Sequence, residues 1–302
     1  MHIPDGLLST PVWATMDVVS IPAVGYLARR AQKEIEESRI PLLGVMGAFV
    51  FAAQMINFPV GLGTSGHLLG ATLLAVTLGP AAAAVVMTAI LAIQALVFQD
   101  GGLLALGANV FNMAVLGVLT GYLPYHFLGG GSWRRFSIFL GGVLSVLTGA
   151  ALAMLQLRLS GVPLTGNLVG ISSALFLVTA GLEGAITLAV VEGVEAISPR
   201  WVRQPAGAPA KTLGILSATA VLLAVVGVLF ASGSPDGLES LAEKAGIAEN
   251  ARNLLATPLA DYEARFLGSE WPRKAAAGII GLSLIYIVCV VTGRFLARRR
   301  NA

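Results

Sequence analysis

The chain has 302 residues, of which 56% are hydrophobic and only 12% are charged, and its mean hydropathy is +0.82. A soluble domain carries about 25% charged residues, so this composition excludes an ordinary soluble protein and indicates a helical membrane protein. We expect a lipid bilayer around the chain. The formal net charge of +3 could indicate a nucleic-acid partner in a soluble protein. Here we attribute it to basic loops at one membrane face and expect no nucleic-acid partner. The chain has a single cysteine, Cys289, which lies in an apolar run. One cysteine cannot form a disulfide or a Cys-x-x-Cys site within the chain.

Apolar runs divide the chain into nine predicted membrane spans. In chain order they are Trp13–Leu27, Pro41–Asn57, His67–Leu78, Ala81–Phe98, Leu103–Phe127, Phe136–Leu157, Leu168–Ile197, Leu213–Ala231 and Ala275–Leu296. The third run is short for a span and is separated from the fourth only by Gly79-Pro80, so the count depends on this break. The sequence therefore predicts an all-α polytopic membrane bundle of about seven spans, followed by two more.

Positive charge follows alternate spans and predicts the orientation of the chain. The basic residues after spans one, five, seven and nine are Arg29, Arg30, Lys33, Arg39, Arg134, Arg135, Arg200, Arg203, Lys211, Arg294 and Arg298–Arg300. The short loops on the other side, 58–66 and 99–102, contain no Lys or Arg. Because basic loops stay in the cytoplasm, we expect a cell-membrane protein with its N-terminus outside and its C-terminus inside.

A stretch rich in proline and alanine, 198–211, predicts a linker at residues 201–211. It separates a first membrane domain, residues 1–200, from a second, residues 212–302. The second domain has two spans on either side of a polar outer loop, 232–272, in which we expect short helices. The start of the chain has no basic segment followed by an apolar core, so we expect no secretory signal and a free amine on Met1.

Two of the three histidines, His2 and His67, fall on the predicted outer face. The terminal amine, the backbone nitrogen of His2 and its imidazole can close fused chelate rings on one metal ion, and His67 can add a fourth nitrogen. Such a nitrogen set suits Ni(II) or Cu(II) better than Mg or Ca. A histidine near a membrane end is more often interfacial or hydrogen-bonded, which is how we interpret His126. His2 is different because it occupies the one position where a chelate with the terminal amine forms.

The glycine-rich run before His67 formally matches the dinucleotide pattern G-x-G-x-x-G. That interpretation is rejected because the run lies between spans, with no preceding strand and no acidic residue about 20 positions later. We interpret the glycines as permitting a tight turn that carries His67 toward the N-terminus. No HExxH, GxSxG or phosphate-binding GxxxxGK[ST] motif is present, so no enzyme is predicted and ATP hydrolysis would need another chain.

Polar groups near the same face are candidates to orient the metal-bound groups. They are Ser65, Asp100, Asn109 and Asn112. The alternative for the asparagines is hydrogen bonding between helices. Glu183, inside the seventh span, needs a partner that the sequence does not name. Three small residues at four-residue spacing, Gly44, Ala48 and Ala52, predict close helix packing within the chain, with docking of another subunit as the alternative.

Three motifs in the first part of the chain and one in the second resemble a known family. The opening Met1-His2-Ile3-Pro4-Asp5-Gly6, the glycine-rich run ending in His67, and Asp100-Gly101-Gly102-Leu103…Gly107-Ala108-Asn109…Asn112-Met113 resemble the M component of energy-coupling factor (ECF) nickel/cobalt transporters. This resemblance covers about residues 1–200. The segment Ser234-Pro235-Asp236-Gly237-Leu238-Glu239 resembles the PDGLE-type N component, a two-span accessory protein that is fused to the M component in some systems.

The resemblance implies a fold like that of ECF substrate-binding components and a substrate-specificity subunit for Ni(II) or Co(II). It implies that the Met1 amine, the His2 amide nitrogen and imidazole, and His67 bind the ion. It also implies a transmembrane coupling subunit and cytoplasmic ABC ATPases as partners, and no resident cofactor. Nickel is slightly favoured by the Irving–Williams order. The alternatives are a secondary metal permease that works alone and a membrane metal sensor or scaffold.

Overall fold

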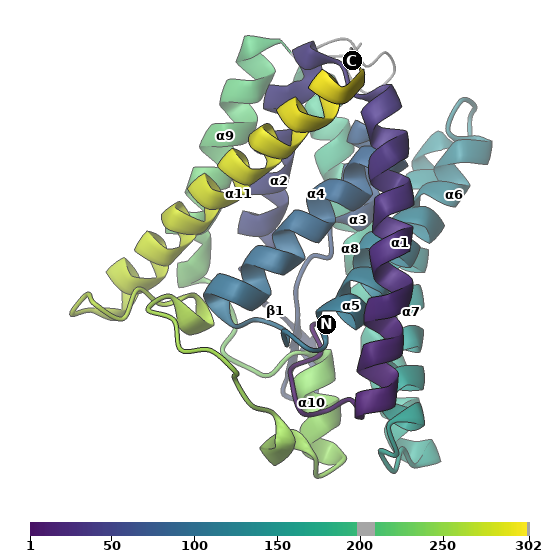
Figure 1. Ribbon diagram of the computed structural model, residues 1–302, viewed down its shortest axis with the longest axis vertical. Helices are drawn as coiled ribbons and strands as arrows, with labels where there is room; N and C mark the ends of the chain where they lie inside the picture. Colours follow the sequence, from purple (N-terminus) through teal and green to yellow (C-terminus); the bar gives the residue numbers. More distant parts are fainter. Residues whose placement is uncertain (198–208, 301–302) are drawn as a thin grey trace.

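The computed structural model describes residues 1–197 and 209–300, and these form a helical bundle with one two-stranded hairpin (Figure 1). Within them, seven helical segments are long and apolar enough to cross a membrane. They are α1 (Thr10–Glu34), α4 with η2 (Pro80–Ile93, Gln94–Phe98), α5 with η3 and α6 (Leu106–Asn109, Val110–Gly117, Val118–Leu128), α7 (Arg134–Leu159), α8 (Gly166–Ile197), α9 with η4 (Ala210–Val225, Gly227–Leu229) and α11 (Glu270–Arg300). The predicted all-α membrane fold is confirmed.

The second and third predicted spans form shorter helices than expected. The second is α2 (Ile40–Gln54), and the third is α3 (Ala71–Leu78), which leaves His67 in a non-helical segment before the helix. All eight residues of α3 are buried, as are all of α2 except Pro41 and Ala53. These runs are apolar because they fill the centre of the protein, where irregular backbone can also be accommodated at membrane depth.

The chain still alternates in direction as the nine segments predict. Arg39, just before α2, donates to the carbonyl of Thr77 near the end of α3 (3.4 Å), so the chain returns to the level where α2 began. The predicted break after the third segment is confirmed, because α3 ends at Leu78 and α4 begins at Pro80. Gly79 joins them with a φ of +88°, a conformation that favours glycine.

Between α2 and α3 the chain forms an antiparallel hairpin of β1 (Phe58–Gly61) and β2 (Thr64–Gly66). Leu62 and Gly63 at its tip both have positive φ, as a tight turn requires. Gly66 lies so close to α8 that a Cβ there would be 3.0 Å from the side chain of Thr179. The glycine-rich run is therefore a turn packed against the bundle, in agreement with the conformational interpretation.

The small-residue stripe of α2 packs against α11, the last helix of the chain. A Cβ at Gly44 would lie 2.7 Å from the ring of Tyr286, and one at Gly47 would lie 3.0 Å from the sulfur of Cys289. At Gly44 the predicted internal packing is confirmed, and the partner helix belongs to the second predicted domain. The two parts of the chain thus share one membrane-embedded core.

The outer loop contains the expected short helices. They are α10 (Gly237–Lys244) and the 3₁₀ turns η5 (Ala248–Asn250) and η6 (Ala260–Tyr262); a further 3₁₀ turn, η1 (Glu37–Arg39), precedes α2. Residues 198–208, which include Arg200, Arg203 and most of the predicted linker, lie outside the described residues. The domain boundaries therefore stay predictions.

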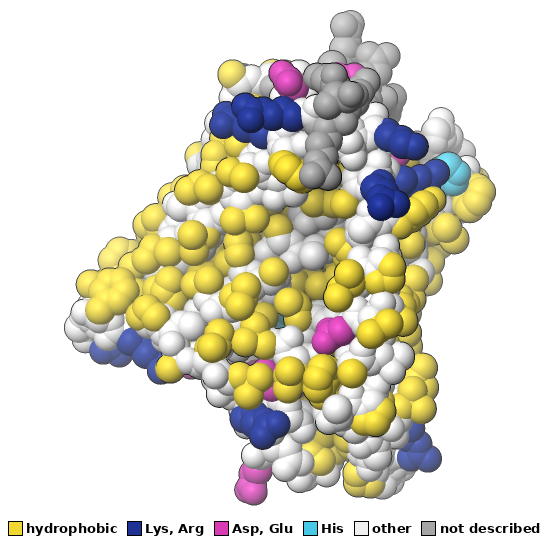
Figure 2. All heavy atoms as spheres, in the orientation of Figure 1, with side chains coloured by type: hydrophobic (Ala, Val, Ile, Leu, Met, Phe, Trp, Pro, Cys, Tyr) yellow, Lys and Arg dark blue, Asp and Glu magenta, His cyan; other side chains and the backbone are white. Residues whose placement is uncertain are grey.

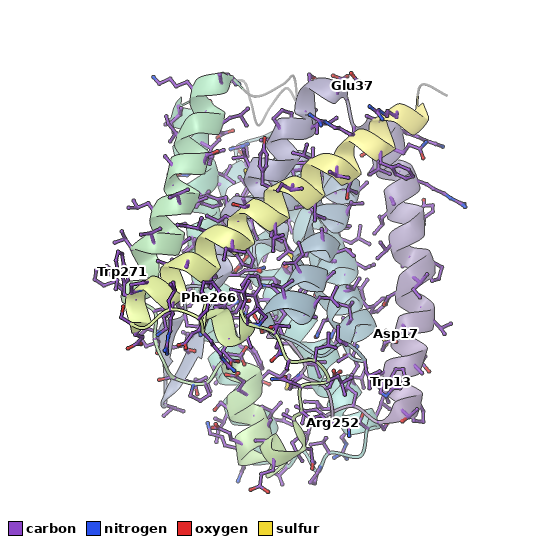
Figure 3. All side chains as sticks on the ribbon, turned by 60° about the vertical axis from the view of Figure 1, so that its left-hand side comes forward. Trp13, Asp17, Glu37, Arg252, Phe266 and Trp271 are labelled. Carbon is purple, nitrogen blue, oxygen red and sulfur yellow. The ribbon has the colours of Figure 1, made fainter. Side chains whose placement is uncertain are left out.

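The two ends of the bundle differ in charge and content. The ends of α1 and α11 lie together at the top of Figure 1, and Figure 2 shows groups of basic side chains near this end, with further basic side chains toward the lower end. The N-terminus, the hairpin and α10 lie toward the opposite end. Figure 3 shows Glu37 at the basic end, with Arg252 and Trp13 toward the other. The short loops 58–66 and 99–102 contain no Lys or Arg, and this is the asymmetry from which the orientation is predicted.

Candidate metal site

The first residues of the chain are folded into the bundle. Ile3 is completely buried and His2 is 6% exposed. The backbone N–H of Ile3 donates to Oδ1 of Asn109 (2.8 Å), and Nδ2 of Asn109 donates back to the carbonyl of Ile3 (3.0 Å). This two-way amide contact fixes the main chain immediately after His2. The predicted role of Asn109 in orienting a metal-bound imidazole stays a prediction.

Asp5 is a second anchor, which the sequence-based set does not include. Its carboxylate accepts the backbone N–H groups of Leu103 (2.9 Å), Leu104 (2.8 Å) and Ala105 (3.2 Å), ahead of α5. The carbonyl of Ile3 also accepts the N–H of Gly102 (2.9 Å). An ionised carboxylate that accepts several backbone N–H groups is strongly held. Asp5 therefore ties the N-terminal arm, residues 1–6, to the loop 99–105.

Replacing Gly102 with alanine is expected to displace this arm. A Cβ at Gly102 would lie 2.2 Å from Oδ1 of Asp5 and 2.4 Å from its backbone nitrogen, so the arm and the loop cannot both stay in place. We expect Gly102→Ala to weaken nickel binding by about 10- to 100-fold, the range found when groups that orient metal ligands are lost. Isothermal titration calorimetry measures this. Gly130→Ala is the matched control, because nothing lies within 4 Å of the added Cβ; equal affinities for both variants would contradict the expectation.

The arm brings the three predicted ligand residues together. The Met1 amine lies 2.8 Å from Nε2 of His67. The rings of His2 and His67 are stacked, with 5.4 Å between their centroids and 9° between their planes. Met1 also forms an ion pair with Asp236, whose Oδ2 lies 3.7 Å from Nε2 of His67. His67 and Asp236, which are 66 and 235 positions from Met1 in the sequence, thus both contact its amine.

The imidazole of His2 is held from one side. Its Nδ1 lies 3.0 Å from Oδ1 of Asp100, and the hydroxyl of Tyr262 donates to the other oxygen of this carboxylate (2.5 Å). Burial alone would raise the pKa of Asp100, but His2 and the Tyr262 hydroxyl hold it well below its usual range. The other ring nitrogen of His2, Nε2, is buried and has no hydrogen-bond partner among the described residues.

His67 is in the form that a metal ion requires. Burial and then repulsion from the Met1 ammonium lower the pKa of His67, which favours the neutral imidazole. Its Nδ1 lies 3.0 Å from the carbonyl of Leu68 and, as the N–H, donates to it. That tautomer leaves the lone pair of Nε2 directed at the Met1 amine, which is how metal-binding histidines are commonly oriented.

Glu183 of α8 finds its partner in the segment that follows His67. It is completely buried, and its two oxygens accept the N–H groups of Leu69 (2.6 Å) and Gly70 (2.8 Å) at the start of α3. These N–H groups have no partner within the helix, so the two carboxyl oxygens satisfy them. Glu183 therefore fixes the backbone beside His67 from the centre of the membrane domain.

Ser65 and Asn112 have different surroundings from each other. Ser65 donates through its hydroxyl to the carbonyl of Ser234 (2.7 Å) and through its N–H to that of Pro235 (2.8 Å), so it holds the segment before Asp236. Asn112 forms a two-way amide pair with Gln156 (2.8 and 2.9 Å) and joins two helices instead of contacting the site. For Asn112 the interhelical alternative describes the structure.

Asp236 reaches the site from the second part of the chain, and sequence reasoning did not single it out. It caps α10: its Oδ1 accepts the N–H groups of Leu238 (2.7 Å) and Glu239 (2.9 Å), and Glu239 accepts the N–H of Asp236 (2.8 Å). The spacing Asp-x-x-Glu signals such a capping box. Burial would raise the pKa of Asp236, but the Met1 ammonium and His67 hold it well below its usual range.

The donor set limits what this site can bind. In the part of the chain that the structure describes, no three His, Cys, Asp or Glu side chains form a metal-binding group. Main-chain nitrogen lies beside the two histidines, in the terminal amine, which contacts His67, and in the amide of His2. A cavity of about 270 Å³ leads to both histidines and is bordered by the carboxylates of Asp100, Asp236, Glu239 and Asp261. Asp261 is paired with Arg265, whereas the carboxylate of Asp100 lies beside His2 and adds negative charge near the nitrogen atoms, which favours cations.

Comparison with known proteins agrees with this geometry. The family model described as "Cobalt uptake substrate-specific transmembrane region", CbiM, matches residues 2–201, more than half of the chain. The chain belongs to the CbiM family. A second family model, the PDGLE domain, matches residues 210–298, so the CbiM part is followed by a PDGLE domain in one chain. Both parts of the resemblance drawn from the sequence are confirmed.

Relatives of this CbiM-family chain include fused proteins of the same layout. A putative fused nickel transport protein of Archaeoglobus fulgidus is 36% identical over 298 residues, which cover 94% of this chain and 95% of the relative. A probable fused nickel transport protein of Lactiplantibacillus plantarum is 34% identical over 217 residues, 66% of each chain. A solved structure described as a truncated transition metal transporter is 35% identical with a TM-score of 0.58, and the match covers 65% of this chain and 99% of that one. This chain is a nickel/cobalt transport membrane protein of the CbiM type and not an enzyme.

Proposed function

We propose that the chain is the substrate-binding subunit of an ATP-driven ECF-type importer and captures Ni(II) or Co(II) from outside the cell. The observation that carries this proposal is the meeting of the Met1 amine with Nε2 of His67 at 2.8 Å, beside the stacked ring of His2. The metal ion is the cargo of the importer. Four nitrogen atoms in one plane favour Ni(II) over Co(II) in the intrinsic order of affinities.

The proposed ligands are the Met1 amine, the amide nitrogen and Nδ1 of His2, and Nε2 of His67. The amine and the amide close a five-membered ring on the ion, and the amide and Nδ1 close a six-membered ring. Since Nδ1 of His2 faces Asp100 in the structure, the imidazole has to turn toward the amide as the ion binds. The amine and the amide each lose a proton in this step, so affinity falls as the pH is lowered.

Asp236 acts in this proposal as a positioning residue for the amine. It faces one positive charge before binding, the ammonium of Met1. After binding it faces a dication and a deprotonated amide, which again sum to one positive charge. Because the attraction is nearly the same in both states, Asp236 favours neither of them by charge. Its contribution is to hold the arm against His67.

We therefore expect Asp236→Asn to weaken nickel binding by only about tenfold, through poorer positioning of the arm. Isothermal titration calorimetry of the full chain measures the change. Asp261→Asn is the control, because this carboxylate borders the same cavity but pairs with Arg265 (2.6 Å). A thousandfold loss in Asp236→Asn would make the carboxylate a direct ligand, and an unchanged affinity would remove its positioning role.

In this proposal the fused PDGLE domain forms part of the entrance to the metal site. The N–H of Arg252 donates to the carbonyl of Asp5 (3.0 Å), and the hydroxyl of Thr64 donates to that of Ser240 (3.1 Å). The loop 232–272 therefore contacts both the N-terminal arm and the hairpin before His67. This supports a role for the loop in delivering the ion or retaining it.

We place the N-terminus outside and the C-terminus in the cytoplasm of the cell membrane, because the short loops 58–66 and 99–102 near the metal site contain no Lys or Arg, whereas basic residues follow the spans at the other end. The proposed partners are a transmembrane coupling subunit and cytoplasmic ABC ATPases. The need for these partners is tested by measuring uptake of radioactive nickel in cells that lack their own nickel transporters. We expect accumulation only when the partner subunits are co-expressed; ATP-independent accumulation by this chain alone would favour a secondary permease.

A further inference from the structure

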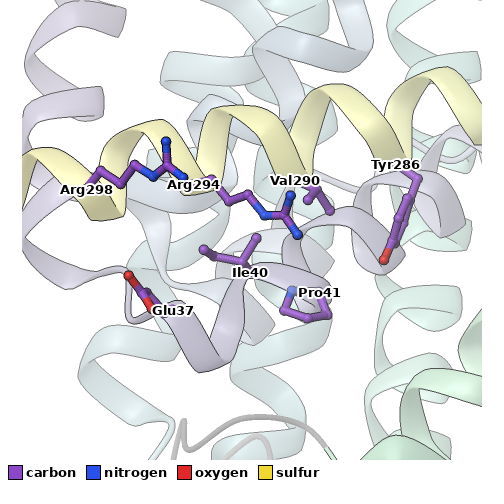
Figure 4. A pocket seen from close by; sticks show the side chains of 7 residues that line it. All are labelled: Glu37, Ile40, Pro41, Tyr286, Val290, Arg294 and Arg298. Atoms are coloured by element: carbon purple, nitrogen blue, oxygen red, sulfur yellow. The ribbon is translucent and has the colours of Figure 1, made fainter.

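Two cavities that the metal site does not use lie next to each other along α11. The first, of about 280 Å³, is at the basic end of the bundle and separates η1 and the start of α2 from the last turns of α11. Figure 4 shows the side chains of Arg294 and Arg298 extending from α11 on one side of this cavity, with Glu37, Ile40 and Pro41 on the other. Tyr286 closes its inner end.

The two arginines are available to an anion. They are four residues apart on one helix and so share a face, both are exposed, and neither has a hydrogen-bond or ion-pair partner among the described residues. One carboxylate, that of Glu37, borders the same cavity, so the cavity keeps a surplus of positive charge. Arginine is well suited to phosphate because its planar group donates two parallel hydrogen bonds.

The position of these arginines along α11 matches the edge of a bilayer. The 19 residues from Ala275 to Gly293 contain no charged side chain. A helix of that length spans about 28 Å, close to the roughly 30 Å thickness of the hydrocarbon core. Lys274 flanks one end of this stretch and Arg294 the other. Arg294 and Arg298 follow directly after the uncharged stretch, so we expect them near the level of the phospholipid headgroups.

The second cavity borders the adjacent part of α11, toward the N-terminal end of that helix. It has about 380 Å³, shares Tyr286 with the first, and lies between α2, α9 and α11. Its walls are mainly apolar and include Val45, Ala48 and Ile287. Small residues along the groove, such as Ser217 and Ser283, leave it open toward the lipid.

We propose that the two cavities form one binding site for an anionic phospholipid, with its phosphate between Arg294 and Arg298 and an acyl chain in the groove. The combination of unpaired arginines, expected near headgroup level, with an adjacent apolar groove matches both halves of such a lipid. A free phosphate ion would use only the arginines. Since α2 belongs to the CbiM part and α9 and α11 to the PDGLE part, the lipid would contact both parts of the chain.

The test is lipid retention by the full chain in detergent. The purified protein is incubated with equal amounts of phosphatidylglycerol and phosphatidylcholine, and bound lipid is counted by native mass spectrometry. We expect phosphatidylglycerol to be preferred, and Arg294→Gln with Arg298→Gln to weaken its binding about thirtyfold, which corresponds to about 1 kcal/mol for each arginine. The control is Arg29→Gln with Arg30→Gln, which removes the same charge from exposed positions on α1. Equal loss in the control would overturn the proposal.

A second variant tests the groove. Ser283→Leu adds a larger apolar side chain at an exposed position that borders it, and we expect this change to reduce phosphatidylglycerol binding while the chain stays folded and binds nickel. Unchanged lipid binding, together with displacement of the lipid by inorganic phosphate, would show an anion site without an acyl chain. If the arginine variant retained lipid but no longer assembled with the coupling subunit, the surface would be a protein-docking site. Either result would overturn the proposal.

Discussion

A three-residue extension ahead of Met1 is expected to lower the affinity for Ni(II) by at least about a thousandfold. The extension converts the Met1 amine into an amide and moves the new terminus away from His2, so the fused chelate rings cannot form. Loss of a group that only orients a metal ligand lowers metal affinity by about 10- to 100-fold. Here a ligand itself is lost, so the expected decrease in affinity is larger. The amine also contacts Asp236 and His67, and an extension converts it into an amide that cannot form the ion pair with Asp236.

The length of this extension is chosen for a chemical reason. One added residue would place histidine third, where an amine, two amides and an imidazole can bind Ni(II) without His67. Three added residues exclude that arrangement. The same three residues added at the C-terminus are the control, and isothermal titration calorimetry measures both proteins. Unchanged affinity in the N-terminal variant would show that the terminal amine is not a ligand.

His67→Ala is expected to weaken nickel binding by about a hundredfold or more, because it removes one of four nitrogen atoms and leaves a vacant position for water. The fold should be retained, since Glu183 holds the adjacent backbone through the N–H groups of Leu69 and Gly70, which the substitution leaves in place. Calorimetry gives the affinity, and thermal unfolding shows that the variant is folded.

His126→Ala is the matched control for this variant. His126 lies near the end of α6, where its ring packs against Tyr122 and Phe127 and makes no contact with Met1, His2 or His67. We expect the His126→Ala variant to bind nickel with the same affinity as the unchanged chain. If His67→Ala and His126→Ala bound nickel equally well, His67 would have no place in the ligand set.

The long apolar helices were predictable because their signal is local. Each predicted span corresponds to a helix, and the turn at Gly79-Pro80 follows from two residues with strong conformational preferences. The lengths of α2 and α3 were not predictable. An apolar run at the centre of a membrane protein and one facing lipid have the same composition, so hydropathy cannot separate them.

The candidate site was predicted only where it depends on position in the chain. His2 stands out because it follows the terminus, and His67 because charge asymmetry assigns it to the same face. Asp5, Asp236 and the partner of Glu183 could not be predicted, because their roles are contacts between distant segments. The capping box around Asp236 predicts the start of α10, but no local pattern indicates that its other oxygen meets Met1.

The central claim is that one metal ion is bound in a plane by four nitrogen atoms that include the terminal amine. The most direct measurement is the nickel content and visible absorption spectrum of the purified chain with its native terminus, with magnetic susceptibility on the same sample. The account predicts one Ni(II) per chain, diamagnetic and with the single visible band of a planar four-nitrogen complex. Paramagnetic six-coordinate nickel, or the same planar spectrum after acetylation of the Met1 amine, would contradict it.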